Sequence, residues 1–117
     1  MTSTEKGKLG ENKAEEYLVS IGYKILTKNY RQKCGEIDII AVEMGIDGDT
    51  IVFTEVKTWN NFTAFDLEYS INYKKQYKIK KTSYNYLYTN VENIYKYIRF
   101  DVILIQNDII NHMKGAF

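Results

Sequence analysis

The feature that most constrains the fold is a pair of short strand-like runs in which acidic residues stand among aliphatic ones. The first run spans residues 35–41 and the second spans residues 51–57. A turn segment bracketed by glycines separates them, which is typical of a β-hairpin. Because strand side chains alternate between two faces, some carboxylates share a face with aliphatic residues. The sequence therefore predicts a hairpin that carries carboxylates on a partly buried face.

The register of this hairpin is predicted to bring two carboxylates together. With the turn centred between residues 46 and 47, the pairs nearest the turn are apolar, namely Val42 with Ile51 and Ile40 with Phe53. The next pair on that face is Asp38 with Glu55, with Cβ atoms about 5 Å apart. Like charges directly opposite destabilise a sheet unless a cation lies between them or one carboxylate keeps its proton. This pairing predicts a divalent-metal site, with Lys57 one strand repeat further on the same face.

The pattern of residues in these strands resembles the active-site motif of the PD-(D/E)XK nuclease superfamily. Asp38, a hairpin and then Glu55-Val56-Lys57 stand in the motif's places, with Ile37 where proline is common. Glu-x-Lys alone is a weak motif, whereas the ordered set of segments along the chain is specific. That set is similar to the YraN-like family of small endonuclease-like proteins, relatives of archaeal Holliday junction resolvases. The matching segments are Gly10-Glu11-x-x-Ala14-x-x-Tyr17-Leu18, Asn29-Tyr30-Arg31, residues 35–41, residues 52–57, Lys75-x-x-Lys78-Ile79, Arg99-Phe100-Asp101-Val102 and Ala116-Phe117. The chain departs from the family pattern at Trp59, where arginine is usual, and at Ser83, where alanine is usual.

The resemblance implies a restriction-endonuclease-like fold and a metal-dependent nuclease that acts on DNA. Asp38 and Glu55 would bind Mg²⁺ or Mn²⁺, which prefer oxygen ligands. Lys57 would orient the attacking water or neutralise charge on the phosphate. Glu11 on the first helix would complete the site, as a metal ligand through water or by orienting the substrate. The resolvase relationship implies branched DNA as the substrate class and a homodimer, because paired cuts need two active sites.

Two other function classes remain open at this stage. One is a catalytically inactive nucleic-acid-binding module that retains the nuclease fold. The intact set of Asp38, Glu55 and Lys57 argues against it. The other is metal-dependent chemistry on a substrate that is not a nucleic acid, which no motif in the sequence supports.

Basic and aromatic residues concentrate in the second half of the chain. Five lysines, at 74, 75, 78, 80 and 81, lie within eight residues, and eight of the eleven tyrosines lie between Tyr69 and Tyr97. One interpretation is a surface that holds phosphates and stacks bases. On a helix, Lys74, Lys78 and Lys81 would then share a face, beside one formed by Tyr73, Tyr77 and Tyr84. The other interpretation is the composition bias of AT-rich coding DNA together with a solvated helix face.

Several further charged residues have both a functional and a structural interpretation. Arg31 and Arg99 have the guanidinium geometry that suits phosphate, and Arg99 can equally form a salt bridge with Asp101. Glu36 shares a face with Asp38, where it either supports the strand or helps to attract a cation. Gly35 is expected to allow a close backbone approach or a positive φ.

The composition favours one soluble domain. A length of 117 residues, with 44% hydrophobic and 26% charged residues, suits a single globular domain. The net charge of +1 does not by itself indicate a nucleic-acid-binding protein. No apolar run approaches the ~20 residues of a membrane span, and the start of the chain does not resemble a secretory signal, so we expect a cytoplasmic location.

A single cysteine, Cys34, and a single histidine, His112, exclude an internal disulfide and a two-histidine zinc site. We expect Cys34 to be inert and His112 to be a surface or packing residue.

The hydrophobic pattern predicts a single α/β domain, a mixed β-sheet flanked by helices in the order α-β-β-β-α-β-β. A capping box formed by Thr2 and Glu5 predicts the start of the first helix, which ends near Ser20. Outside the hairpin, the other elements are expected as a strand at 23–31, a long helix at 67–88, and strands at 98–105 and 109–113.

Overall fold

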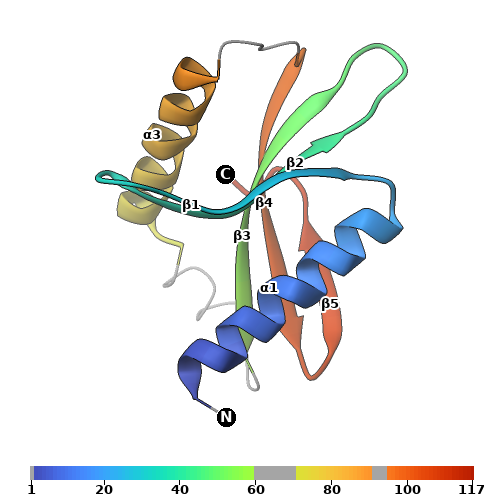
Figure 1. Ribbon diagram of the computed structural model, residues 1–117, viewed down its shortest axis with the longest axis vertical. Coiled ribbons are helices and arrows are strands. Elements are labelled where there is room, and N and C mark those ends of the chain that lie inside the picture. Colours follow the sequence, from blue (N-terminus) through green and yellow to red (C-terminus); the bar gives the residue numbers. More distant parts are fainter. Residues whose placement is uncertain (1, 60–70, 91–94) are drawn as a thin grey trace.

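The computed structural model describes residues 2–59, 71–90 and 95–117, which form a five-stranded sheet and two helices (Figure 1). In chain order the elements are α1 (Ser3–Ser20), β1 (Lys24–Gln32), β2 (Gly35–Glu43), β3 (Thr50–Trp59), α3 (Tyr73–Thr89), β4 (Tyr97–Gln106) and β5 (Ile109–Met113). The strands lie side by side in sequence order, and β3 and β4 are parallel whereas the other neighbours are antiparallel. The predicted fold class and element order are confirmed. No helix in these residues is long and apolar enough to cross a membrane.

The β2–β3 hairpin has the predicted register. Ile40 pairs with Phe53, and the ladder runs from the turn only as far as the pair Ile39 and Thr54. Beyond that pair, β2 remains paired with β1 as far as Gly35, and β3 remains paired with β4 along its whole length. The sheet therefore splits into two arms, and Asp38 and Glu55 do not form the ladder pair that the sequence predicted.

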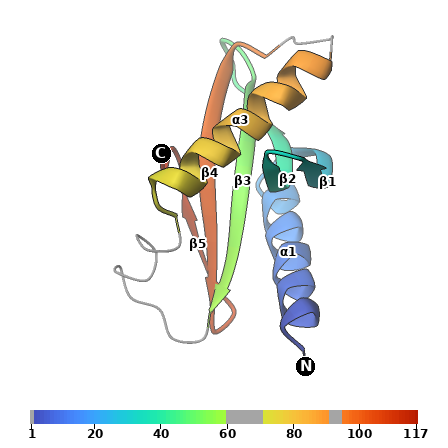
Figure 2. The same cartoon turned by 90° about the vertical axis from the view of Figure 1, so that its left-hand side faces the viewer.

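Each helix covers one face of the sheet, as the alternation of side chains requires. On the α1 face, Ala14 and Leu18 pack against aliphatic residues of β2, β3 and β4, including Ile39, Val52 and Ile103. On the α3 face, Ile79 packs in the cluster of Ile37, Ile40, Ile51, Phe53 and Phe100. Figure 2 shows α3 and α1 at different heights along the sheet, with the ends of β1 and β2 between them.

Both helices begin at a side-chain cap. Thr2 Oγ1 accepts a hydrogen bond from the Glu5 N–H at 3.1 Å, as predicted. In α3, Asn72 Oδ1 accepts from the Lys75 N–H at 3.0 Å, and the helix begins at Tyr73. The expected start near residue 67 is wrong at Ile71 and Asn72, which are not helical, and residues 67–70 lie outside the described part. The last strand has its predicted bounds, Ile109–Met113.

A buried charge network joins β2, β4, β5 and the C-terminal segment. The Asp101 carboxylate is fully buried and accepts hydrogen bonds from the Arg99 guanidinium at 2.8 and 2.9 Å and from the Gly115 N–H at 3.0 Å. His112 Nε2 lies 2.7 Å from the same carboxylate, and a second carboxylate, Glu43, accepts from Arg99 at 2.6 Å. Burial raises the pKa of Asp101, but the hydrogen bonds from His112 and Arg99 outweigh burial and hold it at about 2. The salt-bridge interpretation of Arg99 and the packing interpretation of His112 are therefore confirmed.

Replacing Asp101 by Asn should destabilise the protein by about 3 kcal/mol, because the partly buried Arg99 guanidinium loses the fully buried carboxylate that balances it. Urea unfolding followed by circular dichroism measures the change. Asp108→Asn is the matched control, since Asp108 forms an exposed ion pair with Lys13 that contributes at most about 1 kcal/mol. Equal unfolding midpoints for the two variants would contradict the assigned role of the network.

Candidate active site

The split between β2 and β3 leaves a cavity of about 450 Å³ that is reached by side chains from both helices. It is lined by Lys6, Gly7 and Glu11 of α1, Glu36 and Asp38 of β2, Glu55, Val56, Lys57 and Thr58 of β3, and Lys75 of α3. All four residues predicted to be catalytic, Glu11, Asp38, Glu55 and Lys57, are therefore brought to one cavity.

The Asp38 side chain lies in the gap where main-chain pairing stops. Its Oδ2 atom accepts a hydrogen bond from the Val56 N–H at 2.7 Å. Ile37 and Ile40 pack in the same cluster on the α3 face, so the regular alternation of β2 is interrupted at Asp38. Asn29, which lies opposite Asp38 in the β1–β2 register, has a φ of +53°. The carboxylate thus replaces a main-chain acceptor and at the same time faces the cavity.

The charge repulsion expected between Asp38 and Glu55 is present in the folded protein. Burial and then the nearby charge of Glu55 raise the pKa of Asp38 from 3.8 to about 7, and Glu11 adds to the effect. The hydrogen bond from Val56 and the charge of Lys57 oppose this change without cancelling it. The Asp38 carboxyl therefore keeps its proton to a much higher pH than an ordinary aspartate, although it lies beside two cationic residues.

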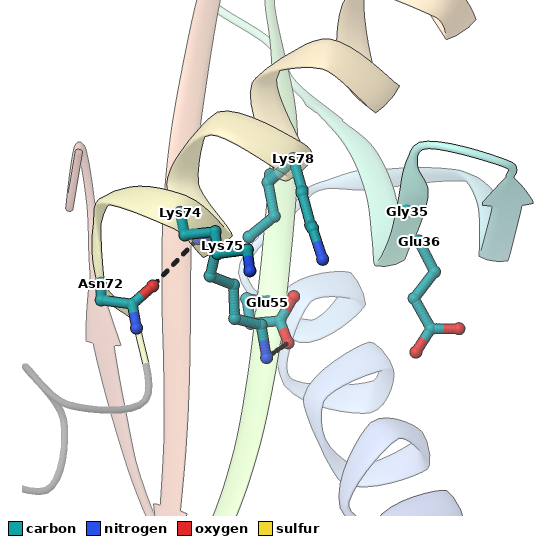
Figure 3. A pocket seen from close by; sticks show the side chains of 8 residues that line it. Gly35, Glu36, Glu55, Asn72, Lys74, Lys75 and Lys78 are labelled. Carbon is teal, nitrogen blue, oxygen red and sulfur yellow. Dashed lines mark hydrogen bonds and ion pairs between the residues drawn. The ribbon is translucent and has the colours of Figure 1, made fainter.

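Two lysines hold the Glu55 carboxylate, which is only 8% exposed. The Lys75 ammonium lies 3.3 Å from Glu55 Oε1 (Figure 3). The Lys57 ammonium lies 3.5 Å from the same atom. Burial and the neighbouring Lys75 lower the pKa of Lys57. Lys75 was predicted only as a phosphate contact, and the structure places it in the carboxylate cavity as well.

A glycine on α1 sets the position of Glu11. Gly10 is buried against β3, and a Cβ atom at this position would collide with the Thr58 hydroxyl. Gly10 therefore lets α1 approach β3 closely, and the next residue, Glu11, reaches the cavity together with Gly7 one helical turn earlier. The Gly-Glu motif could have indicated that the helix packs closely against a strand at the glycine. The sequence does not reveal that Thr58 is the strand residue opposite Gly10.

The donor set suits a hard divalent cation in its chemistry, because Glu11, Asp38 and Glu55 offer only oxygen ligands. Within the described residues, no three acidic, histidine or cysteine side chains converge as a ready-made metal site. Instead, two ammonium groups lie beside Glu55 and supply the positive charge there. Cation binding would require Lys75 or Lys57 to leave this carboxylate.

A second cavity, of about 350 Å³, continues from the first along the side of α3 (Figure 3). It is lined by Gly35, Glu36, Glu55, Asn72, Lys74, Lys75, Lys78 and Ile79. The two cavities share Glu36, Glu55 and Lys75. Gly35 has a φ of +154° and approaches Thr82 closely, as expected of a glycine here.

Two of the residues predicted to bind DNA lie outside both cavities. Arg31 forms an ion pair with Glu36 at 3.1 Å, and both side chains are largely exposed at the rim. Lys81 is exposed on the next turn of α3.

Cys34 Sγ lies 3.3 Å from the Thr82 hydroxyl, beside the helix. Ser83, one of the two departures from the expected pattern, is buried and donates to the Ile79 carbonyl at 2.8 Å, which indicates a packing role.

Comparison with known proteins matches residues 10–105 to the model of the family described as "Uncharacterised protein family UPF0102". A UPF0102 protein from Persephonella marina is 46% identical over 118 residues, an alignment that covers 100% of this chain and 97% of the relative. One from Thermodesulfovibrio yellowstonii is 44% identical, with 100% and 99% covered. One from Clostridioides difficile is 45% identical over the full length of both chains.

Asp38→Asn should stabilise the protein at high pH and have no effect at low pH. The raised pKa means that the folded state keeps a proton that the unfolded chain has already released, so Asp38 lowers stability as the pH rises from 3.8 through about 7. Asn still accepts from Val56 and carries no charge. We expect a gain of about 2 kcal/mol near pH 8, roughly half the full linkage value because the cavity is open to water.

Thermal unfolding at several pH values measures this difference. Glu16→Gln, an exposed carboxylate on α1, serves as the control and should show no such trend. If Asp38→Asn is no more stable than the parent protein at high pH, the ionised Asp38 carboxylate does not lower the stability of the folded state.

Proposed function

The chain belongs to the UPF0102 family, the YraN-like family that its motifs indicate, and we propose that it is a metal-dependent nuclease that hydrolyses phosphodiester bonds of DNA. The observation that carries this proposal is the meeting of Asp38, Glu55 and Lys57 in one partly buried cavity. Glu11 reaches the same cavity from α1. Asp38, Glu55 and Lys57 are the positions at which the sequence resembles the PD-(D/E)XK nuclease motif.

The carboxylates would hold Mg²⁺ or Mn²⁺, with Asp38 and Glu55 as direct ligands and Glu11 as a ligand through water. When bound, such a cation lowers the pKa of a water molecule and neutralises charge that develops on the phosphate. Asp38 would then remain ionised at neutral pH, because a positive charge between the carboxylates removes the repulsion that now raises its pKa.

The two lysines would act on the substrate side of the cavity. The Lys57 side chain is 19% exposed and lies beside Glu55, so its ammonium can hold the attacking water or a phosphate oxygen. Lys75 reaches the same carboxylate from α3. Once a cation neutralises Glu55, the Lys75 ammonium would become available to a phosphate group, together with Lys74 and Lys78 at the neighbouring cavity.

The alternative, an inactive module that only binds nucleic acid, is less well supported by the geometry. Binding requires only the exposed lysines of α3, which attract phosphates without any carboxylate. Glu55 is buried, Asp38 is partly buried, and the two carboxylates repel each other, an arrangement that lowers stability unless it serves a cation. Branched DNA, a homodimer and a cytoplasmic location remain predictions.

Cleavage of DNA should depend on both a divalent metal and Lys57. Labelled linear, flapped and four-way DNA, incubated with Mg²⁺, Mn²⁺ or EDTA, would reveal the activity and its preferred substrate. Lys57→Ala should bind DNA almost normally but cleave it at least about 10²-fold more slowly, which is about 3 kcal/mol of transition-state stabilisation. Lys24→Ala, an exposed lysine at the far end of β1, should cleave at the parent rate. DNA binding without cleavage under every metal condition would instead support the inactive module.

Mn²⁺ binding should require both central carboxylates. Isothermal titration should show one binding event that Asp38→Asn and Glu55→Gln each abolish, because each change removes a charged oxygen ligand from the same cation. Glu16→Gln should bind as the parent protein does, since Glu16 is exposed on the other side of α1 from the cavity residues. Undiminished affinity in both cavity variants would rule out this metal site.

A further inference from the structure

The surface of α3 is divided lengthwise into two rows of different chemistry. Ile79, Thr82 and Ser83 form the buried side of the helix. The lysine row, consisting of Lys74, Lys78 and Lys81, follows on the side that borders the cavities, and Lys75 lies between this row and the buried side. The tyrosine row, consisting of Tyr73, Tyr77, Tyr84 and Tyr88, lies beyond the lysine row, opposite the buried side. Helical periodicity alone produces this order, because each row advances by three, four or seven residues.

The tyrosine row is exposed to an unusual degree for aromatic side chains. Its four members are 89%, 64%, 55% and 89% exposed in chain order. The two rows touch each other, since the Lys81 ammonium lies 6.0 Å from the centre of the Tyr77 ring. Exposed aromatic rings flanked by cations are the elements with which proteins bind unpaired nucleic acid, through base stacking and phosphate contacts.

The charge of the helix specifies the kind of partner. The seventeen residues of α3 include five lysines and no acidic residue. A row of cations without internal compensation attracts a polyanion and repels a basic surface. The same helix contributes Lys75 to the carboxylate cavity, so the lysine row leads directly to the residues assigned to catalysis.

The order of the lysine row and the tyrosine row matches the arrangement of phosphates and bases in an unpaired strand. Phosphates placed on the lysine row lie on the cavity side of α3, and the bases attached to them extend away from the carboxylates towards the tyrosine row. A duplex cannot occupy the surface in this way, because its bases are paired and stacked inside the helix. The tyrosine row can therefore contribute to binding only when the bases are unpaired.

We propose that α3 binds an unpaired strand of DNA, with its phosphates on the lysine row and its bases stacked on the tyrosine row. The cavity would then act on DNA that has a single-stranded segment. The delivery of that strand for cutting rests on the nuclease function proposed above, whereas the binding itself does not.

Fluorescence anisotropy in EDTA tests the binding without any cleavage. The probes are a labelled oligothymidine of about 12 nucleotides and a labelled duplex of the same length. Replacing Tyr77 and Tyr84 together by Leu should weaken binding of the single strand at least about tenfold, because two stacking surfaces are lost. The affinity for the duplex should change less than about twofold.

Matched variants separate stacking from folding and from charge. The Phe variant at Tyr77 and Tyr84 keeps the rings and should bind the single strand as the parent protein does. Tyr97→Leu removes an exposed tyrosine from β4 and should have no effect. Thermal unfolding by circular dichroism confirms that each variant folds.

The salt dependence provides a second, independent readout. Replacing Lys74, Lys78 and Lys81 together by Gln should flatten the slope of log affinity against log salt by about two on the single strand, at ~0.7 for each phosphate contact. The tyrosine variants should leave this slope unchanged.

Two results would overturn the proposal: the Leu variant binds the single strand as tightly as the parent protein, or it loses affinity for the duplex to the same extent. A protein that shows the predicted binding but never cleaves DNA would contradict the nuclease proposal alone. Cleavage with no effect of the tyrosine variants would contradict the role of α3 alone.

Discussion

The hydrogen bond from the Val56 N–H to the Asp38 carboxylate is the interaction on which the arrangement of the site depends. A sheet can split only if the main-chain groups at the split find other partners, because buried unpaired N–H groups are strongly unfavourable. Asp38 supplies that partner from its side chain. As a result β2 and β3 can diverge beyond the pair of Ile39 and Thr54, and the space between them becomes a cavity lined with carboxylates.

Other parts of the fold hold the elements on both sides of this split in place. Gly10 brings α1 against β3 from one face, and the Asn72 cap fixes the start of α3 near Lys75 on the other. The network around Asp101 satisfies its buried charges with hydrogen bonds, unlike Asp38 and Glu55, which remain under mutual repulsion. Within the described residues, this contrast between a repelling carboxylate pair and a satisfied charge network favours a functional explanation of the pair over a structural one.

The sequence was sufficient to predict the parts that depend on local alternation. The pairing of Ile40 with Phe53 followed from matching apolar residues across the turn, and Asp38 and Glu55, which the sequence predicts to lie together, do line one cavity. The end of the ladder before Asp38 was not predictable, because a split in a sheet depends on how both arms pack against their own neighbours. The position of Lys75 was also missed: the phase of α3 relative to the sheet is set by packing and by the Asn72 cap, which a composition-based analysis of a lysine-rich helix does not reveal.

The central claim is that Asp38 and Glu55 share a single site for a cation, and the titration of the Asp38 carboxyl group by ¹³C NMR tests it most directly. In the protein without metal, the Asp38 carboxyl carbon should titrate with a pKa of about 7, and Glu55→Gln should lower that pKa because it removes the neighbouring charge. Saturating Mg²⁺ in the parent protein should also lower the pKa of Asp38, since a bound cation stabilises the carboxylate. A pKa near the ordinary value of 3.8, unchanged by Mg²⁺ and by Glu55→Gln, would contradict the shared site.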